Sequence, residues 1–113
     1  MIHASTYGNG RKALAEALFT HKAFRTGGAF KGEEYGDFKP SRYDSGRLAG
    51  DDLAAFILDL NSITYVVYSY ATPIAWVTRS ADGTPHVHRV EQKFSPTTSK
   101  HQGLLYMLTH DAR

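Results

Sequence analysis

Six consecutive polar residues near the C-terminus carry the side chains that an anion-binding site needs. They are Thr97, Thr98, Ser99, Lys100, His101 and Gln102. Ser95-Pro96 directly precedes them and predicts a helix start, because serine is a favoured N-cap and proline is tolerated at the first helical position. Backbone N–H groups at a helix start, with hydroxyls and a cation beside them, suit a phosphate or a carboxylate. The alternative is structural: the hydroxyls cap the helix, Lys100 is solvated and His101 packs on the core.

Three histidines are the candidate metal ligands. His86 and His88 stand two apart on a predicted strand, so both side chains project from one face, and His101 follows in the next element. Three neutral imidazoles with an open fourth position are a workable zinc site. The alternative is that these histidines are solvated or hydrogen-bonded within a sheet, so they are weak candidates and the sequence assigns no metal site.

The sequence shows no recognisable catalytic arrangement. Ser99 and His101 lack a nucleophile elbow and an evident orienting acid, and no paired carboxylates suit glycosidase chemistry. Neither glycine cluster matches a P-loop or a dinucleotide fingerprint, so no cofactor is expected. A small hydrolase or metal enzyme built from dispersed residues is left as a further alternative.

Four large aromatic residues lie within a short stretch of the chain: Tyr65, Tyr68, Tyr70 and Trp76. Aromatic rings can stack on the bases of single-stranded nucleic acid with little sequence preference. More commonly such rings are core residues whose polar atoms reach the surface. An exposed face shared by Tyr68 and Tyr70 with Lys100 and Arg79 would favour nucleic-acid binding, whereas burial beneath helices would disfavour it.

Three helices are predicted to position these residues. Apolar residues recur at helical spacing over residues 11–21. Leu53, Phe56, Ile57 and Leu60 form a second stripe, preceded by two aspartates that complement a helix N-terminus. The third helix begins at Ser95-Pro96 or shortly after it and ends near His110, although Gly103 weakens it.

The strands are predicted from β-branched and aromatic runs. Residues 63–70 suit a central strand covered on both faces, and a second strand, residues 74–78, follows a turn at Pro73. In that second strand, alternation places Ile74 and Trp76 on the same face. A hairpin loop through Asp82-Gly83 leads to a third strand at residues 86–94. Residues 22–33, with Gly27-Gly28 in the middle, form either a two-stranded ribbon or an irregular loop.

The composition is that of a globular protein. The chain has 113 residues, of which 42% are hydrophobic and 21% charged, with a net charge of +2 and no cysteine. We expect one domain, residues 1–113 with a core over about 11–110, in the cytoplasm, because neither a signal peptide nor a membrane span is evident. The predicted fold class is α+β: a small, mainly antiparallel sheet of three to five strands with two or three helices packed on one face.

Three segments resemble a known group of proteins. Residues 20–33, residues 65–76 with Ser-Tyr-Ala-Thr-Pro-Ile-Ala, and residues 94–102 with Thr-Thr-Ser-Lys-His-Gln are similar to small uncharacterised proteins of tailed bacteriophages. Similar segments occur there in the same order. The resemblance covers roughly residues 20–103. It implies a phage or prophage accessory protein in the bacterial cytoplasm and brings no activity with it.

The expected function is non-catalytic binding of a host or defence protein, or of a second copy of the chain. The alternative is binding of nucleic acid or a nucleotide phosphate through the Thr97–Gln102 helix start, with Tyr68 and Tyr70 as further contact candidates. The basic residues are interspersed with acidic ones, whereas a dedicated duplex binder carries a denser basic face. No membrane partner is expected.

Overall fold

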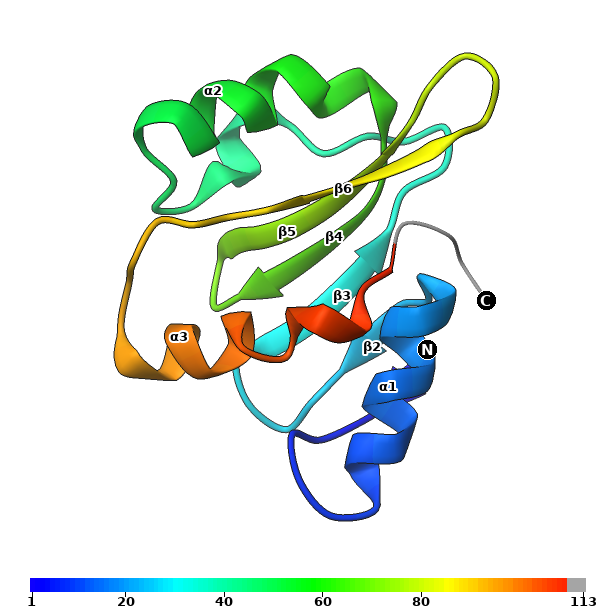
Figure 1. The fold of residues 1–113 in the computed structure, drawn as a ribbon, viewed down its shortest axis with the longest axis vertical. Helices are drawn as coiled ribbons and strands as arrows, with labels where there is room; N and C mark the ends of the chain where they lie inside the picture. The colour runs from blue at the N-terminus through cyan, green and yellow to red at the C-terminus, as the bar shows by residue number, and fades with distance from the viewer. Residues whose placement is uncertain (110–113) are drawn as a thin grey trace.

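One six-stranded sheet organises the chain. The computed structural model describes residues 1–109, and its strands are hydrogen-bonded in chain order (Figure 1). They are β1 (Ile2–His3), β2 (Phe24–Arg25), β3 (Phe30–Glu34), β4 (Ile63–Ser69), β5 (Thr72–Arg79) and β6 (Pro85–Arg89). The β1–β2 pair is parallel and the other pairs are antiparallel. The fold is therefore α+β with a mostly antiparallel sheet.

The predicted number of strands, three to five, is too low. The ribbon at residues 22–33 is present as β2 and β3, whose glycine-containing loop lies between Phe24 and Phe30. β1 was not predicted, because two residues at the end of a chain show no periodicity. β1 forms because its residues pair with the edge of β2, and that pairing arises only in the tertiary structure.

Helices cover both faces of the sheet, so the prediction that they pack on one face is wrong. In β4, Tyr65 and Val67 pack into one core cluster, whereas Val66 and Tyr68 pack into a second. Successive side chains of a strand point to opposite faces, and both faces of β4 are apolar. A strand of this kind needs a cover layer on each side.

The first face is covered by the N-terminal helix and the C-terminal segment. These elements are α1 (Gly10–Thr20), α3 (Pro96–Gln102) and the 3-10 turn η3 (Leu105–Met107) (Figure 1). α1 presents Leu14, Ala17 and Leu18 at helical spacing and confirms the predicted helix within one residue.

The second face is covered by α2 (Gly50–Asp59). The 3-10 turn η1 (Arg42–Ser45) precedes α2 in the chain, and the 3-10 turn η2 (Leu60–Ser62) directly follows it. Phe56 of α2 is fully buried and makes an edge-to-face contact with Trp76 of β5, with ring centroids 5.0 Å apart. Ile57, predicted on the buried stripe, is exposed. α2 therefore packs through a narrower stripe than the sequence predicted.

α3 is shorter than predicted. Ser95 caps it as expected, since its hydroxyl accepts a hydrogen bond from the Thr98 amide, but the helix ends at Gln102 with Gly103 as its C-cap. Leu104, Leu105 and Leu108 then reach the core through η3. His110, the predicted helix end, lies outside the described residues.

A bulge in β5 changes which residues share a face. Val67 pairs with Ala75 and Tyr68 pairs with Pro73, so Ile74 has no direct partner on β4. Ile74 therefore joins Ala75 and Val77 in the first core cluster, while Trp76 lies in the second. The predicted grouping of Ile74 with Trp76 is wrong because strict alternation does not hold through the bulge.

No helix within residues 1–109 combines the length and the apolar character required to cross a bilayer.

Candidate functional site

The β4–β5 turn, residues Tyr70 and Ala71, contains an exposed non-glycine residue with a positive φ. Ser69 pairs with Thr72, so only two residues connect the strands. Tyr70 adopts a left-handed conformation with φ 57°, and its side chain is 58% exposed. Its amide is held by a 2.9 Å hydrogen bond to the carbonyl of Ala29. A bulky residue in this region is uncommon, and such strain often accompanies function.

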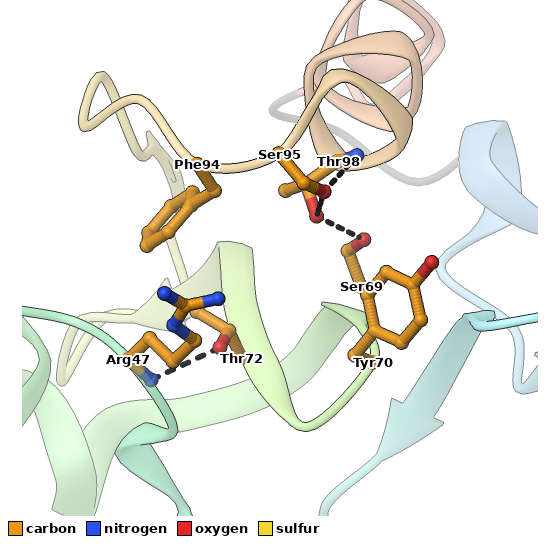
Figure 2. Close-up of a pocket in the computed structure, with 7 residues that line it drawn as sticks. All are labelled: Arg47, Ser69, Tyr70, Thr72, Phe94, Ser95 and Thr98. Atoms are coloured by element: carbon orange, nitrogen blue, oxygen red, sulfur yellow. Dashed lines mark hydrogen bonds between the residues drawn. The ribbon is translucent and has the colours of Figure 1, made fainter.

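A hollow of about 240 Å³ opens beside this turn, and we call it the first hollow. Its walls come from the loop before α2, from the turn itself and from the segment that leads into α3 (Figure 2). The lining residues are Arg47, Ser69, Tyr70, Thr72, Phe94, Ser95 and Thr98. Three segments far apart in the sequence thus build one concave site.

The amide and the carbonyl of Arg47 are both hydrogen-bonded to side chains from distant parts of the chain. Its amide donates to the Thr72 hydroxyl at 3.0 Å, and its carbonyl accepts from the Gln92 side chain at 3.1 Å. The preceding residue, Gly46, has φ 53° and lies so close to the turn that an added Cβ would be 2.5 Å from the Ala71 carbonyl oxygen. Only glycine fits at this close approach.

The guanidinium of Arg47 is directed toward the side on which Phe94 and Ser95 lie (Figure 2). No carboxylate among residues 1–109 forms an ion pair with it. None of the seven residues that line the first hollow is acidic. The first hollow therefore contains one cation, two aromatic rings and several hydroxyls.

A second hollow of about 220 Å³ lies on the other side of the turn. Its lining residues are Lys31, Glu33, Tyr35, Tyr43, Asp44, Gly46, Tyr68 and Ala71. The Tyr35 and Tyr68 hydroxyls are 2.9 Å apart, and burial is the main reason that the pKa of each is raised. Both phenols therefore stay protonated and act as neutral hydrogen-bonding groups. Tyr43 at the rim is 90% exposed.

A chain of hydroxyls connects the first hollow to His101. Ser95 donates to Thr98 at 3.2 Å, Thr98 and Ser69 are 3.0 Å apart, and the Ser69 Oγ lies 2.7 Å from the His101 Nδ1. Ser95 donates to Thr98. Each hydroxyl then has an acceptor for its proton if Thr98 donates to Ser69 and Ser69 donates to the His101 Nδ1. His101 is then neutral, with its proton on Nε2.

The Ser69–His101 pair has the spacing of a nucleophile and its base, but its burial favours a structural role. Ser69 is only 1% exposed, and its hydroxyl already contacts both Thr98 and His101. The His101 ring stacks on Phe30 with centroids 4.5 Å apart. Burial, and secondarily the positive charge of Lys100, lowers the pKa of His101. These contacts describe a buried polar network that attaches α3 to β4.

This network predicts a loss of stability in mild acid. Below the ordinary histidine pKa the unfolded chain binds a proton that folded His101 resists, so the free energy of unfolding falls as pH falls through this range. We expect the melting temperature of the wild type to decrease from pH 7.5 to 5.5. The decrease should be smaller for His101→Gln than for the wild type. For His86→Gln, which alters an exposed histidine and serves as the control, it should equal that of the wild type. Equal slopes for the wild type and His101→Gln would contradict the assignment.

The structure separates the six residues of the predicted anion site. Thr98 and His101 are buried in the polar network. The Gln102 amide donates to the carbonyls of Val90 and Gln92, which are on the segment after β6. Thr97, Ser99 and Lys100 are exposed, and only Thr98 lines the first hollow. The structural alternative therefore holds for Lys100, which is exposed, and for His101, which packs on the core, but the capping hydroxyl is that of Ser95 and not of Thr97, Thr98 or Ser99.

The three candidate metal ligands do not converge. His88 stacks on Trp76 at 4.4 Å and contacts Asp52 at 3.0 Å on the α2 face, whereas His101 stacks on Phe30 on the α1 face. His86 is exposed. Within the described part of the chain, no group of three or more His, Cys, Asp or Glu residues could hold a metal ion.

The candidate stacking tyrosines do not form one exposed platform. Tyr65 is buried and its hydroxyl donates to the Lys22 carbonyl, while Tyr68 is buried within the second core cluster. Trp76 is also buried, and only Tyr70 is exposed. By the criterion set from the sequence, this arrangement disfavours base stacking.

Sequence reasoning missed four residues of the first hollow as site residues: Arg47, Ser69, Thr72 and Phe94. Arg47 lies 22 residues before Ser69 in a loop without periodicity, and no local pattern connects it to the turn. Tyr70 and the Ser95 cap were identified separately, but nothing in the sequence indicated that they meet. The one available signal was Pro73, which marked a chain reversal next to Tyr70.

Comparison with known proteins shows the family. No curated protein and no solved structure matches the chain. A family profile matches residues 6–111, which spans every element that builds the two hollows. The chain therefore belongs to the DUF8033 family, a family of unknown function.

Proposed function

We propose that this chain is a non-catalytic binding protein that engages a protein partner through the β4–β5 turn and the first hollow. The observation that carries the proposal is Tyr70, a strained and exposed tyrosine that lines the first hollow, next to Ala71, which lines the second. A smaller residue such as asparagine or glycine would satisfy this turn with less strain. A tyrosine there is better explained by contacts that its ring makes outside the chain.

The composition around the turn agrees with a protein interface. Tyrosine and arginine are enriched at the energetic centres of interfaces, and Tyr43, Tyr70 and Arg47 are exposed here. The first hollow offers a concave pocket beside them, as an anchoring side chain requires. The anchored backbone of Arg47 reduces the ordering needed on binding.

The partner that we propose is a host or defence protein in the bacterial cytoplasm, with the chain acting as a phage or prophage accessory protein. Support comes from two segments that resemble tailed-phage proteins, residues 65–76 and 94–102. They supply six of the seven residues lining the first hollow, so two of the three resembling segments contribute to the proposed binding site.

Capture from bacterial lysate tests this proposal. We expect the immobilised wild type to retain a protein after nuclease treatment and Tyr70→Asn to retain at most about one tenth as much, as for the loss of an interface anchor. Asparagine tolerates the left-handed conformation, so the turn should be preserved. Tyr106→Asn is the matched control, because Tyr106 is also exposed but lies on η3.

Three outcomes would overturn the proposal. Equal retention by the wild type and Tyr70→Asn would remove the turn from the interface. Retention abolished by nuclease and steeply dependent on salt would favour nucleic-acid binding, for which Thr97, Ser99 and Lys100 remain exposed. Capture of only the chain itself would identify self-association instead.

A further inference from the structure

We infer that the first hollow is a receptor for an acidic side chain, aspartate or glutamate, of the protein partner, with Arg47 binding its carboxylate. This inference rests on the proposed function and specifies the chemistry of the same site. It follows from the charge, the rigidity and the donor supply of the first hollow.

The charge of the first hollow is positive and not compensated by the described chain. Arg47 is its only charged lining residue, and no carboxylate of residues 1–109 pairs with the guanidinium. Two other cations of the described chain do pair with a carboxylate: Arg25 and Lys31 contact Glu33 at 3.3 and 3.5 Å. A guanidinium presents its donors in a planar fork that matches a carboxylate.

The backbone position of Arg47 is held before any ligand arrives. Its amide and carbonyl are both hydrogen-bonded to side chains, those of Thr72 and Gln92. The Gln92 side chain also accepts from the Ala49 amide at 2.9 Å, so Gln92 attaches both Arg47 and Ala49 to the segment after β6. Such anchoring is typical of a preorganised binding residue.

The supply of donors favours a carboxylate over a phosphate. The Thr98 amide donates to Ser95, and the Ser95 hydroxyl donates to Thr98. The hydroxyls of Thr98 and Ser69 are hydrogen-bonded to each other, and Ser69 is hydrogen-bonded to His101, so these hydroxyls are already engaged within the chain. The remaining side-chain donors are the Arg47 guanidinium, the exposed Tyr70 hydroxyl and the hydroxyl of Thr72, which only accepts from the Arg47 amide. One cation balances one carboxylate, whereas a phosphate carries more charge and more acceptor oxygens.

The size and walls of the first hollow fit one side chain. A volume of about 240 Å³ accommodates a glutamate or aspartate with part of its backbone. The rings of Phe94 and Tyr70 provide apolar surface for the methylene groups (Figure 2). An acidic side chain can thus place its carbons against the rings and its carboxylate at Arg47.

NMR titration of the ¹⁵N-labelled chain tests this inference without the partner. The probes are N-acetyl-glutamate N-methylamide, the glutamine analogue and inorganic phosphate. We expect the glutamate compound to cause saturable shifts at the Arg47 Nε–H and at the Tyr70 and Thr72 amides. Arg47→Gln should weaken this binding at least about tenfold, as expected for loss of a charge-assisted bidentate contact. Arg42→Gln, which alters an exposed arginine of η1, should leave it unchanged.

The inference fails if the glutamine compound binds equally, if phosphate binds more tightly, or if no probe shifts these signals. Its failure is distinguishable from failure of the proposed function. Absent shifts together with Tyr70-dependent capture would leave a protein interface of different chemistry. If the glutamate compound alone causes shifts but capture does not depend on Tyr70, the carboxylate site is supported and the proposed protein interface is contradicted.

Discussion

Gly46→Ala is expected to lower the free energy of unfolding by about 3 kcal/mol and the melting temperature by more than about 10 °C. The added Cβ would lie 2.5 Å from the Ala71 carbonyl oxygen and 2.6 Å from the Thr72 Cα, and neither backbone atom can move without opening the β4–β5 turn. The φ of 53° adds strain for any residue with a Cβ. The same displacement would move Arg47 away from Thr72 and weaken partner capture.

Gly50→Ala separates the two causes of this effect. Gly50 has a similar φ of 58°, but no atom lies within 4 Å of the added Cβ, so only backbone strain remains. We expect a loss of about 1 kcal/mol and unchanged capture. Urea unfolding of the wild type and both variants measures the difference. If Gly46→Ala is no more destabilising than Gly50→Ala, the turn is not tightly packed on the Arg47 loop.

Trp76→Ala is expected to be the most destabilising substitution, with a loss of about 4 kcal/mol. Trp76 is fully buried between Phe56 and His88, with ring centroids 5.0 and 4.4 Å away. Its Nε1 also donates to the Asp59 carboxylate at 2.9 Å, which attaches the end of α2 to the sheet. A loss of this size is a large part of the stability of an ordinary domain.

Trp76→Phe keeps this test informative if the alanine variant fails to fold. Phenylalanine retains much of the ring packing and loses the hydrogen bond to Asp59, so we expect a loss of about 2 kcal/mol. Because Trp76 is the only tryptophan, unfolding is followed by far-UV circular dichroism. Destabilisation of less than about 1 kcal/mol by either variant would show that α2 contributes little to the core.

The stability predictions and the binding predictions concern different residues. Trp76 lies under α2 and lines neither hollow, whereas Tyr70 and Arg47 are exposed and stack on no ring of the core. Tyr70→Asn and Arg47→Gln should therefore change the free energy of unfolding little. Gly46 is the exception, because it connects the packing of the turn to the placement of Arg47.

The predictions that succeeded rest on local patterns. Leu14 and Leu18 repeat at helical spacing in α1, and the run from Ile63 to Ser69 is β-branched or aromatic, as a covered strand requires. The Ser95 cap lies three residues from its partner amide, that of Thr98. Helix turns, caps and strand pleats involve residues within a few positions of each other, so the sequence displays them directly.

The errors arose where distant segments meet. The bulge at Ile74 breaks the alternation on which face assignments depend. His101 could be read as a ligand from its type, but its contacts with Ser69 and Phe30, 32 and 71 positions away, make it part of a buried network. A residue type states what a side chain can do, whereas its neighbours in space decide what it does.

Local patterns in the chain were enough to predict the α+β class, the positions of the main helices and central strands and the capped start of α3. Contacts between distant segments were needed to show that helices cover both faces, that Thr98 and His101 are buried, and that Arg47 reaches the turn at Tyr70. Local hydrogen bonds and periodic burial determine the first group. The second group depends on sheet order and on contacts such as that between Arg47 and Thr72, 25 residues apart, which no short pattern records.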